Sequence, residues 1–435
     1  MPGLIVAAPA SGSGKTTLTL GLLRALARRG IEVRGAKSGP DYIDPRFHEA
    51  ACGRPCPNLD AFAMTPEGLR GRAAGDGLLI VEGAMGLFDG AAPAGAGSTA
   101  DLARHLSLPV VLVVDAARMA QSVAPLVAGF AAHDARVRVA GVILNNTGSD
   151  RHVRLLAHAL APLSVRLLGA LPRDPGLSRP SRHLGLVQAH EDPDLEAFLD
   201  RAAERVARHV DLDALADLAG PLPAGSAPRL HPPAQRIAVA RDAAFTFAYP
   251  HLLDGWRAAG AEIATFSPLN DEAVPPADLV YLPGGYPELH AGALSCAATF
   301  RTTLRHAART TDVFGECGGY MALGAGLVDA DGTRHAMADL LPLETSFAAR
   351  RLHLGYRRLH AAAGPMAGNW AGHEFHYATT LREDGPPLFD ATDAEGGALA
   401  PMGLSLGRVQ GSFAHLIERR EGAFRLTSHA GSEAG

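Results

Sequence analysis

The sequence predicts an α/β protein with two domains, the first of them a doubly wound parallel sheet. Apolar runs of strand length alternate with longer helical patterns along the 435-residue chain, as in parallel sheets with crossover helices. A stretch rich in Pro, Gly and Ala interrupts this alternation at residues 221–235 and is interpreted as a linker. A chain this long exceeds one ordinary hydrophobic core. We therefore expect domains at residues 1–220 and 236–435.

Composition excludes several classes of protein. Hydrophobic residues make up 47% of the chain, charged residues 20%, and the net charge is −5. This balance does not suggest a nucleic-acid-binding surface. No apolar stretch is long enough to span a bilayer and no signal-peptide pattern is seen, while four cysteines do not form a disulfide framework. We expect a cytoplasmic protein with neither nucleic acid nor membrane as partner.

The first strand, residues 4–8, leads into the sequence Ala-Ala-Pro-Ala-Ser-Gly-Ser-Gly-Lys-Thr-Thr at residues 7–17, and a helical pattern follows at 16–29. This context predicts a phosphate-binding loop. Its two glycines let backbone N–H groups face phosphate oxygens. Lys15 can reach the outer phosphates, and the Thr16 hydroxyl can bind Mg²⁺. Pro9 stands where the usual motif begins with Gly, and the alternative is a Gly/Ser-rich turn before an ordinary helix.

Carboxylates follow the next two predicted strands. Residues 31–36 run into Lys37-Ser38-Gly39-Pro40-Asp41-Tyr42-Ile43-Asp44, and residues 78–81 end in Glu82. Open α/β sheets bind ligands at the carboxyl ends of their strands, and a carboxylate there can hold Mg²⁺. Asp41 and Asp44 also suit turns, and Glu82 is otherwise a plain strand-end residue. The phosphate-binding loop upstream favours metal binding.

Two more strands, at residues 110–114 and 139–144, continue the first domain, with helices predicted at 116–130 and 191–210. The second strand ends in Asn145-Asn146. An Asn side chain can donate to and accept from a purine edge, and it can equally cap a helix. Cys52 and Cys56 lack the further ligands of a zinc site and are interpreted as structural.

The second domain carries a candidate cysteine nucleophile. Strands are predicted at residues 236–240, 262–266, 278–282 and 312–315, with a helix at about 250–259. The third strand ends in Gly284-Gly285, whose N–H groups can form an oxyanion hole. The fourth leads into Glu316-Cys317-Gly318-Gly319, which resembles a nucleophile elbow. The N-terminus of the helix that follows would lower the pKa of the Cys317 thiol. A buried structural cysteine is the alternative.

A cysteine nucleophile needs a general base, and two segments offer one. The sequence Gly-His-Glu-Phe-His-Tyr contains His373 and His376, and His415 follows a predicted strand at residues 407–413. The residues alone do not choose between these histidines.

The motifs occur in a specific order along the chain. After the phosphate-binding loop come Gly-Pro-Asp-Tyr-Ile-Asp, Val-Glu-Gly, Pro-Gly-Gly-Tyr-Pro-Glu, Glu-Cys-Gly-Gly, Gly-His-Glu-Phe-His-Tyr and a late histidine. This order resembles, over nearly the whole chain, the cobyrinic acid a,c-diamide synthase family, which includes the hydrogenobyrinic acid enzymes. The first domain is then similar to the dethiobiotin-synthetase type of P-loop domain, and the second to a class I glutamine amidotransferase.

The resemblance implies a carbon–nitrogen ligase of cobalamin biosynthesis. Such enzymes use ATP and Mg²⁺ to phosphorylate the a- and c-acetate carboxylates of a corrin ring, which are then amidated with ammonia released from glutamine. The implied cofactors are ATP and Mg²⁺, the implied partners are a corrinoid tetrapyrrole acid and glutamine, and a homodimer is expected. Phosphorylation is needed because water is not displaced from a free carboxylate at useful rates.

The resemblance also implies roles for individual residues. Cys317 is the glutaminase nucleophile and His415 its base, and Gly284 and Gly285 supply the oxyanion hole. Ile417 stands where the common glutaminase triad has a Glu, and Glu418 comes one residue later. The implied ligands are Ser11, Gly12, Ser13, Gly14, Lys15, Thr16, Thr17 and Asn145 for ATP, Thr16, Asp41 and Glu82 for Mg²⁺, and Lys37, Tyr42 and Asp44 for the activated carboxylate.

The same motifs are compatible with other functions. Cobyric acid synthase amidates other side chains of the same ring, and a related a,c-diamide synthase acts on a nickel tetrapyrrole. The sequences Asp41-Tyr42-Ile43-Asp44 and Arg182-His183-Leu184-Gly185 favour the a,c-enzyme. A P-loop regulatory ATPase with a degenerate amidotransferase domain is a non-enzyme alternative, and the presence of Cys317 and His415 argues against it. The sequence does not distinguish a cobalt-bearing ring from a metal-free one.

Overall fold

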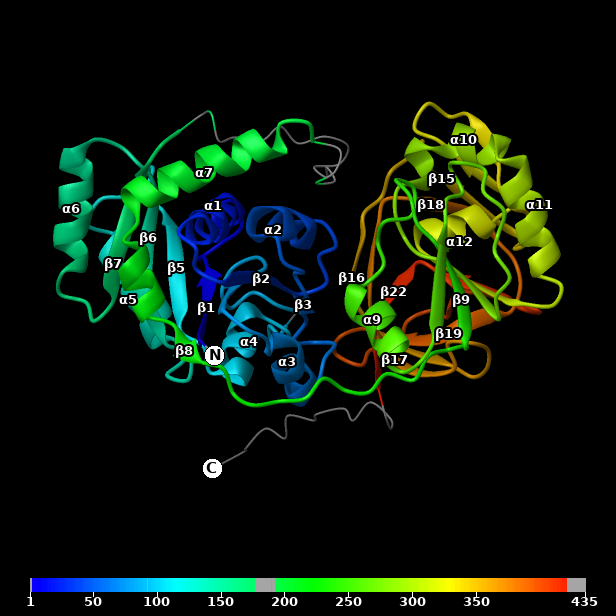
Figure 1. The fold of residues 1–435 in the computed structure, drawn as a ribbon, viewed down its shortest axis with the longest axis horizontal. Coiled ribbons are helices and arrows are strands. Elements are labelled where there is room, and N and C mark those ends of the chain that lie inside the picture. Colours follow the sequence, from blue (N-terminus) through cyan, green and yellow to red (C-terminus); the bar gives the residue numbers. More distant parts are fainter. Residues whose placement is uncertain (1, 92, 175, 177–188, 190–191, 421–435) are drawn as a thin grey trace. The chain divides into compact units, whose positions relative to one another are not determined.

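The computed structural model describes residues 2–91, 93–174, 176, 189 and 192–420 (Figure 1). The motif at residues 182–185 lies outside this described part. The chain divides into two compact units, residues 1–228 and 229–435. Each unit has its own hydrophobic core and its own main sheet, so each is considered by itself.

The first unit contains the expected doubly wound parallel sheet. Its strand order is β3-β2-β4-β1-β5-β6-β7, all parallel, and β8 pairs antiparallel with β1. After β1 the chain moves to one side of the sheet, and after β4 it crosses to the other, so a topological switch point lies at the carboxyl ends of β1 and β4. The strands are β1 Pro2–Ala7, β2 Val33–Ser38, β3 Asn58–Leu59, β4 Leu78–Glu82, β5 Val110–Asp115, β6 Val139–Thr147, β7 Arg166–Pro172 and β8 Gly220–Pro221.

Helices lie on both sides of this sheet (Figure 1). They are α1 Lys15–Arg28, α2 Asp44–Cys52, α3 Pro66–Ala73, α4 Thr99–Leu106, α5 Val123–Ala132, α6 Asp150–Leu160, α7 Leu195–His209 and α8 Leu212–Asp217. In α1 an apolar stripe with helical spacing, which includes Leu18, Leu22 and Leu26, is buried in the core that α7 also joins. The close packing of α1 on α7 depends on Gly21, because a Cβ atom there would lie 2.6 Å from Val206.

One predicted helix boundary was wrong. The sequence pattern placed a helix at residues 116–130, whereas α5 begins at Val123. The Asp115 side chain accepts the N–H of Ala117, and turns with Met119 N–H on Ala116 and Val123 N–H on Ala120 fill the gap. A side-chain-to-backbone bond of this kind competes with helix formation.

The second unit is built on a ten-stranded sheet of order β10-β9-β11-β12-β21-β20-β19-β16-β17-β22. The first five strands are parallel and the others antiparallel. A separate small sheet has the order β14-β13-β15-β18. The strands of the main sheet are β9 Arg236–Ala240, β10 Glu262–Phe266, β11 Leu279–Leu282, β12 Asp312–Glu316, β16 His353–Ala361, β17 Gly368–His376, β19 Pro387–Thr392, β20 Met402–Leu406, β21 Val409–Ser412 and β22 Ala414–Arg420.

The remaining elements of this unit are short. The small sheet consists of β13 Gly326–Val328, β14 Arg334–Ala336, β15 Leu343–Ser346 and β18 Thr379–Glu383, and the helices are α9 Pro250–Ala258, η4 Pro287–Leu289, α10 Ala291–Cys296, α11 Ala298–Ala307 and α12 Gly318–Leu323. The strand predicted at residues 407–413 is β21, and it is shorter than expected. His415 belongs to the next strand, β22, where it pairs with His373 of β17.

Candidate active sites

The segment between β1 and α1 has the backbone of a phosphate-binding loop. Gly12 and Gly14 have φ angles of +80° and +86°, a region that L side chains rarely adopt. The Asn145 amide donates to the Ser13 carbonyl at 3.0 Å, which ties the loop to the end of β6. Lys15 is buried and donates to the Met85 carbonyl at 2.5 Å. The phosphate-binding loop, the start of α1 and the segment after β4 therefore meet at one place.

Glu82 is the centre of this site. Its carboxylate is fully buried and accepts from the Thr16 hydroxyl at 2.6 Å and from the Lys37 ammonium at 2.8 Å, both at Oε1. Oε2 lies 2.6 Å from His48 Nε2. Burial disfavours the charged form, but Lys37 and His48 outweigh it and hold the pKa of Glu82 well below its usual range. Glu82 is therefore a buried carboxylate kept ionised by its neighbours.

The loop after β2 adds a second carboxylate to Lys37. Lys37 donates to Asp44 Oδ2 at 2.5 Å. Burial opposes the charge of Lys37, yet Glu82 and Asp44 raise its pKa, and burial together with Asp41 raises the pKa of Asp44. Asp41 Oδ1 accepts the N–H groups of Ile43 at 2.7 Å and Asp44 at 3.0 Å. Through Oδ1, Asp41 therefore stabilises a turn, as one of the two interpretations of this residue predicted.

The residues at this site fit Mg²⁺ in chemistry and position. The ion prefers oxygen ligands and normally keeps several waters, and the Thr16 hydroxyl and Glu82 carboxylate are already in contact beside the phosphate-binding loop. A bound Mg²⁺ would neutralise charge on the phosphates, and Thr16, Asp41 and Glu82 remain predicted ligands.

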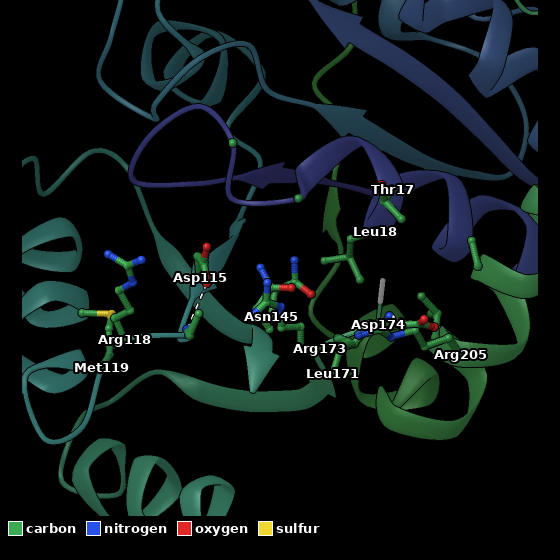
Figure 2. Close-up of a pocket in the computed structure, with 16 residues that line it drawn as sticks. Thr17, Leu18, Asp115, Arg118, Met119, Asn145, Leu171, Arg173, Asp174 and Arg205 are labelled. Atoms are coloured by element: carbon green, nitrogen blue, oxygen red, sulfur yellow. Dashed lines mark hydrogen bonds and ion pairs between the residues drawn. The ribbon is translucent and has the colours of Figure 1, made fainter. Parts of the chain in front are cut away.

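A cavity of about 860 Å³ opens beside the phosphate-binding loop. Gly12, Gly14, Thr17 and Asn145, all predicted to contact ATP, line it. Figure 2 shows Arg118 and Met119 at one end of the cavity and Asp174 and Arg205 at the other. Arg205 and Asp174 form an ion pair, with 3.2 Å between Nη1 and Oδ2. Asn145 and Asn146 both line the cavity, a position that suits recognition of a purine edge.

Replacing Gly14 by Ala is expected to weaken ATP binding. An Ala at φ +86° is strained, and its Cβ atom would lie 2.2 Å from the Asn145 amide nitrogen. Gly30→Ala is the matched control, because Gly30 has φ +75° with no atom within 4 Å of a Cβ atom. Both variants should lose about 1–2 kcal/mol of stability. Only Gly14→Ala should raise the KM for ATP, by about tenfold or more; equal KM values for the two variants would contradict this role.

The second unit places Cys317 at a strained turn between β12 and α12. Its backbone has φ 46° and ψ −103°, as expected for a nucleophile elbow. The glycines predicted to form the oxyanion hole lie here too. A Cβ atom on Gly318 would be 2.9 Å from the Gly285 nitrogen, and one on Gly284 would be 2.4 Å from His415 Cε1. The packing thus brings both glycines to the elbow and the histidine.

Cys317 and His415 are both buried, and burial shifts the pKa of each group toward its neutral form. Burial, with Glu288 as the next cause, raises the pKa of the Cys317 thiol, although the Gly318 N–H opposes this. Burial and the nearby His373 and His376 lower the pKa of His415 to about 3. The N–H of Gly318 at the helix N-terminus lowers the pKa of this thiol as expected, but desolvation outweighs it, so the expected net lowering is wrong.

Glu316 occupies the place beside His415 that the sequence left unassigned. Ile417 and Glu418 continue β22, and both are buried. The carboxyl group of Glu316, the residue before the nucleophile, lies beside His415, with Oε2 3.8 Å from His415 Nδ1. Burial raises the pKa of Glu316 to about 8.

The buried Glu316 predicts a particular dependence of stability on pH. Its folded-state pKa lies above the ordinary value of 4.5 for a glutamate, so its stabilising contribution is complete below about pH 4.5 and is lost as the pH rises through 8. A shift of this size corresponds to roughly 5 kcal/mol. Glu316→Gln should lessen the fall in melting temperature of the second unit between pH 5 and 9, whereas Glu383→Gln should not. An unchanged slope in Glu316→Gln would contradict the shift.

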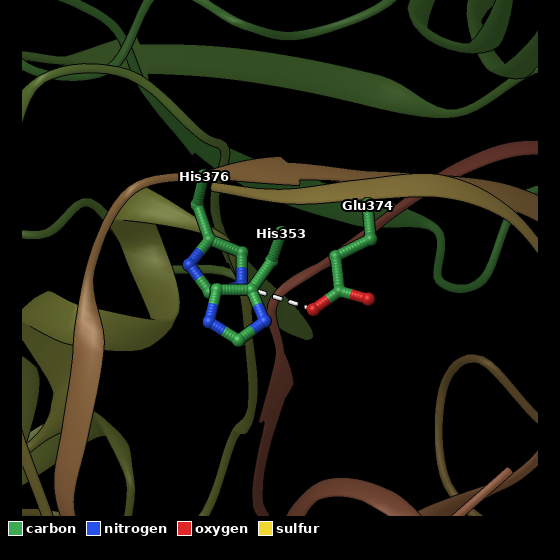
Figure 3. A group of neighbouring side chains, drawn as sticks. All are labelled: His353, Glu374 and His376. Atoms are coloured by element: carbon green, nitrogen blue, oxygen red, sulfur yellow. Dashed lines mark hydrogen bonds and ion pairs between the residues drawn. The ribbon is translucent and has the colours of Figure 1, made fainter. Parts of the chain in front are cut away.

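A second cluster of titratable groups lies on β16 and β17. His353, Glu374 and His376 form the one group within the described residues whose possible metal-ligand atoms converge, all within 4.8 Å. Figure 3 shows the two stacked rings with Glu374 beside them. Glu374 already pairs with Arg357 at 2.7 Å and His376 at 2.9 Å. Although burial opposes it, these partners lower the pKa of Glu374 to about 2, so the cluster is a satisfied ion-pair network.

Sequence reasoning missed several of these residues. His48 comes one helical turn after Asp44, a spacing that places both on one face of α2. Lys15 and Lys37 are the only lysines in the chain, and both lie at this site, so the scarcity of lysine was a usable signal. Glu316 gave no signal of its own, because its position beside His415 comes from the pairing of distant strands.

Family models match both units. Residues 4–187 match the CobQ/CobB/MinD/ParA nucleotide binding domain, and residues 236–422 match the CobB/CobQ-like glutamine amidotransferase domain. These matches agree with the fold predicted for each half of the chain.

Three curated relatives cover almost the whole chain, and each is named hydrogenobyrinate a,c-diamide synthase. The protein from Rhizobium meliloti is 57% identical over 97% of this chain and 100% of its own length. The protein from a Sinorhizobium species is 56% identical over 96% and 99%. The protein from Rhodobacter capsulatus is 55% identical over 95% and 98%. By this identity along its whole length, the chain belongs to the hydrogenobyrinate a,c-diamide synthase family.

Proposed function

We propose that this protein catalyses the ATP-dependent, glutamine-hydrolysing amidation of the a- and c-acetate carboxylates of hydrogenobyrinic acid. The observation that carries the proposal is the identity of 55–57% with synthases of that name over at least 95% of the chain. The metal-free ring is favoured over the cobalt-bearing one because the relatives are named for it. In the described part of the chain, no helix is long and apolar enough to cross a membrane.

The first unit is proposed to activate the substrate carboxylate. Backbone N–H groups of residues 11–17 and the Lys15 ammonium hold the phosphates of ATP, whose purine edge meets Asn145 in the cavity. Lys37 is buried between two carboxylates, which makes it a fixed positive charge beside the reacting groups. We propose that Lys37, Tyr42 and Asp44 position the acetate carboxylate, whose oxygen attacks the γ-phosphorus and forms an acyl phosphate with release of ADP.

The second unit is proposed to release ammonia. The Cys317 thiol gives its proton to His415 and the sulfur attacks the carboxamide of glutamine, while the N–H groups of Gly284 and Gly285 stabilise the developing oxyanion. His415 then protonates the leaving nitrogen, and water hydrolyses the thioester to glutamate. Ammonia displaces phosphate from the acyl phosphate, and the two amidations each consume one ATP and one glutamine.

Mass spectrometry of the tetrapyrrole tests the proposal. Hydrogenobyrinic and cobyrinic acid are incubated separately with ATP, Mg²⁺ and glutamine, and the products are compared with those of cobyric acid synthase. Two acid-to-amide conversions on hydrogenobyrinic acid, at the a and c positions, are expected. Conversion at other side chains, or none on either ring, would overturn the assignment. The subunit number from light scattering tests the expected homodimer.

A further inference from the structure

We propose that Glu316 is a positioning residue of the glutaminase, and that it completes a Cys317–His415–Glu316 triad from the strand that carries the nucleophile. This inference rests on the proposed function of the second unit. In the common triad, a Glu on the strand of the histidine orients the imidazole. Ile417 stands at that position here and cannot do so, and we assign this role to Glu316.

The position of Glu316 is fixed on both sides. Its Oε1 accepts the backbone N–H of Leu416 at 3.1 Å, the residue directly after His415. Its Oε2 accepts the Tyr281 hydroxyl of β11 at 2.8 Å. The side chains of Glu316 and His415 are each 2% exposed. The carboxyl group is therefore hydrogen-bonded to the backbone N–H of the residue that follows the histidine it is proposed to orient, which fixes its position relative to β22.

The contact assigns one nitrogen of the imidazole. Oε2 lies 3.8 Å from Nδ1 of His415, longer than a hydrogen bond and close enough for one after a small movement. A carboxylate at this place favours the tautomer with hydrogen on Nδ1. Nε2 then keeps its lone pair for the Cys317 proton, and the imidazolium that forms faces a negative charge.

The donors around Glu316 suit a carboxylate. Two donors already point at its oxygens, and the His415 Nδ1–H would be a third. Burial raises the pKa of Glu316, so the ionised fraction grows with pH, and a positive charge on His415 favours it further. The groups that face this pair are Tyr281 of β11, Cys317, and His373, Glu374 and His376 of β17.

Two variants separate this role from packing. Glu316→Gln keeps the shape and can still accept from Leu416, but its amide NH₂ donates toward Nδ1 and favours the wrong tautomer. Glu316→Asp keeps the charge. Glu383→Gln is the control: Glu383 also accepts a tyrosine hydroxyl, from Tyr320 at 2.5 Å, but it lies exposed on β18.

We expect Glu316→Gln to lower kcat for glutamine hydrolysis by about 100-fold or more, with KM for glutamine changed less than threefold. Glu316→Asp should recover part of that loss, and Glu383→Gln should behave as wild type. The rise of wild-type glutaminase activity between pH 6.5 and 9 should be absent in Glu316→Gln. The alkylation rate of Cys317 by iodoacetamide, followed on its peptide by mass spectrometry, should fall in parallel.

Amidation with added ammonia does not use the thiol site. It therefore distinguishes failure of the proposed triad from failure of the proposed function. The triad is supported by three results together. The wild type converts the substrate fully with ammonia, Glu316→Gln melts normally, and its loss of kcat is confined to glutamine hydrolysis. A glutaminase kcat in Glu316→Gln within threefold of wild type overturns it, whatever the tetrapyrrole product. Equal glutaminase losses in Glu316→Gln and Glu316→Asp, with a normal wild-type pH profile in both, also overturn it. Failure of ammonia-dependent conversion in the wild type overturns the proposed function instead.

Discussion

Replacing Cys317 by Ala should abolish glutamine-dependent amidation and leave ammonia-dependent amidation intact. The thiol is the attacking atom in the proposed glutaminase reaction, and loss of such an atom costs about a thousandfold or more. The side chain is small and buried at the β12–α12 turn, so Ala fits the same space. Steady-state rates with glutamine and with an ammonium salt, measured on the same preparation, give the two numbers needed.

Cys296→Ala is the control for this experiment, because Cys296 is an exposed free cysteine of the same unit. It should keep both activities. Residual glutamine-dependent amidation above a few per cent in Cys317→Ala would contradict the assignment of the nucleophile. Loss of both activities would show that Ala disturbs more than the thiol chemistry.

Replacing Lys15 by Ala should lower amidation with either nitrogen source by about 100-fold to 1000-fold, because the charge on the transferred phosphoryl group loses its closest cation. Burial lowers the pKa of Lys15, partly offset by Glu82, and the ammonium is held against a backbone carbonyl. Glutamine hydrolysis, a reaction of the second unit, should be much less affected.

Because Lys15 and Lys37 are the two lysines of the chain, the role of Lys15 in nucleotide binding can be tested directly by labelling. An acyl-phosphate derivative of ATP, which acylates nearby lysines, should label Lys15 or Lys37 and should be blocked by excess ATP. Lys15→Ala should reduce nucleotide-protected labelling. Arg24→Ala is a suitable control, since Arg24 belongs to the same helix but pairs with Glu196 and Asp200 on α7. Wild-type amidation rates in Lys15→Ala would contradict the role of this residue.

The predictable parts of the molecule are those with local signals. The phosphate-binding loop, the strand before it and the helix after it follow from glycine positions and apolar periodicity, and the structure confirms them as a strand, loop and helix. The start of α5 was predicted wrongly because one Asp115 hydrogen bond outweighs helical periodicity. His48 shares a face of α2 with Asp44, which the spacing indicates, but its contact with Glu82 depends on the pairing of β2 with β4. The contact of Glu316 with His415 depends on the pairing of β12 with β21. Such pairings join residues far apart in sequence, so no local pattern contains them.

The motif around Cys317 also suggested the wrong net shift for the pKa of its thiol. A helix N-terminus behind a cysteine suggests an acidic thiol, but α12 is only six residues long and Cys317 is buried. Desolvation acts on the whole thiolate charge, whereas the helix supplies a fraction of one charge. Burial was not visible in the residues that flank the cysteine.

The contacts of Lys15 and Thr16 with Met85 and Glu82 mean that nucleotide binding is an exchange of partners. Phosphate oxygens must take the place of the Met85 carbonyl, so the affinity reflects the difference between two bonds rather than one bond gained. Met85 is exposed and has φ +49°, and the exchange removes its link to the loop. In the proposed function, occupancy of the phosphate-binding loop is therefore expected to change the contacts of the segment after β4.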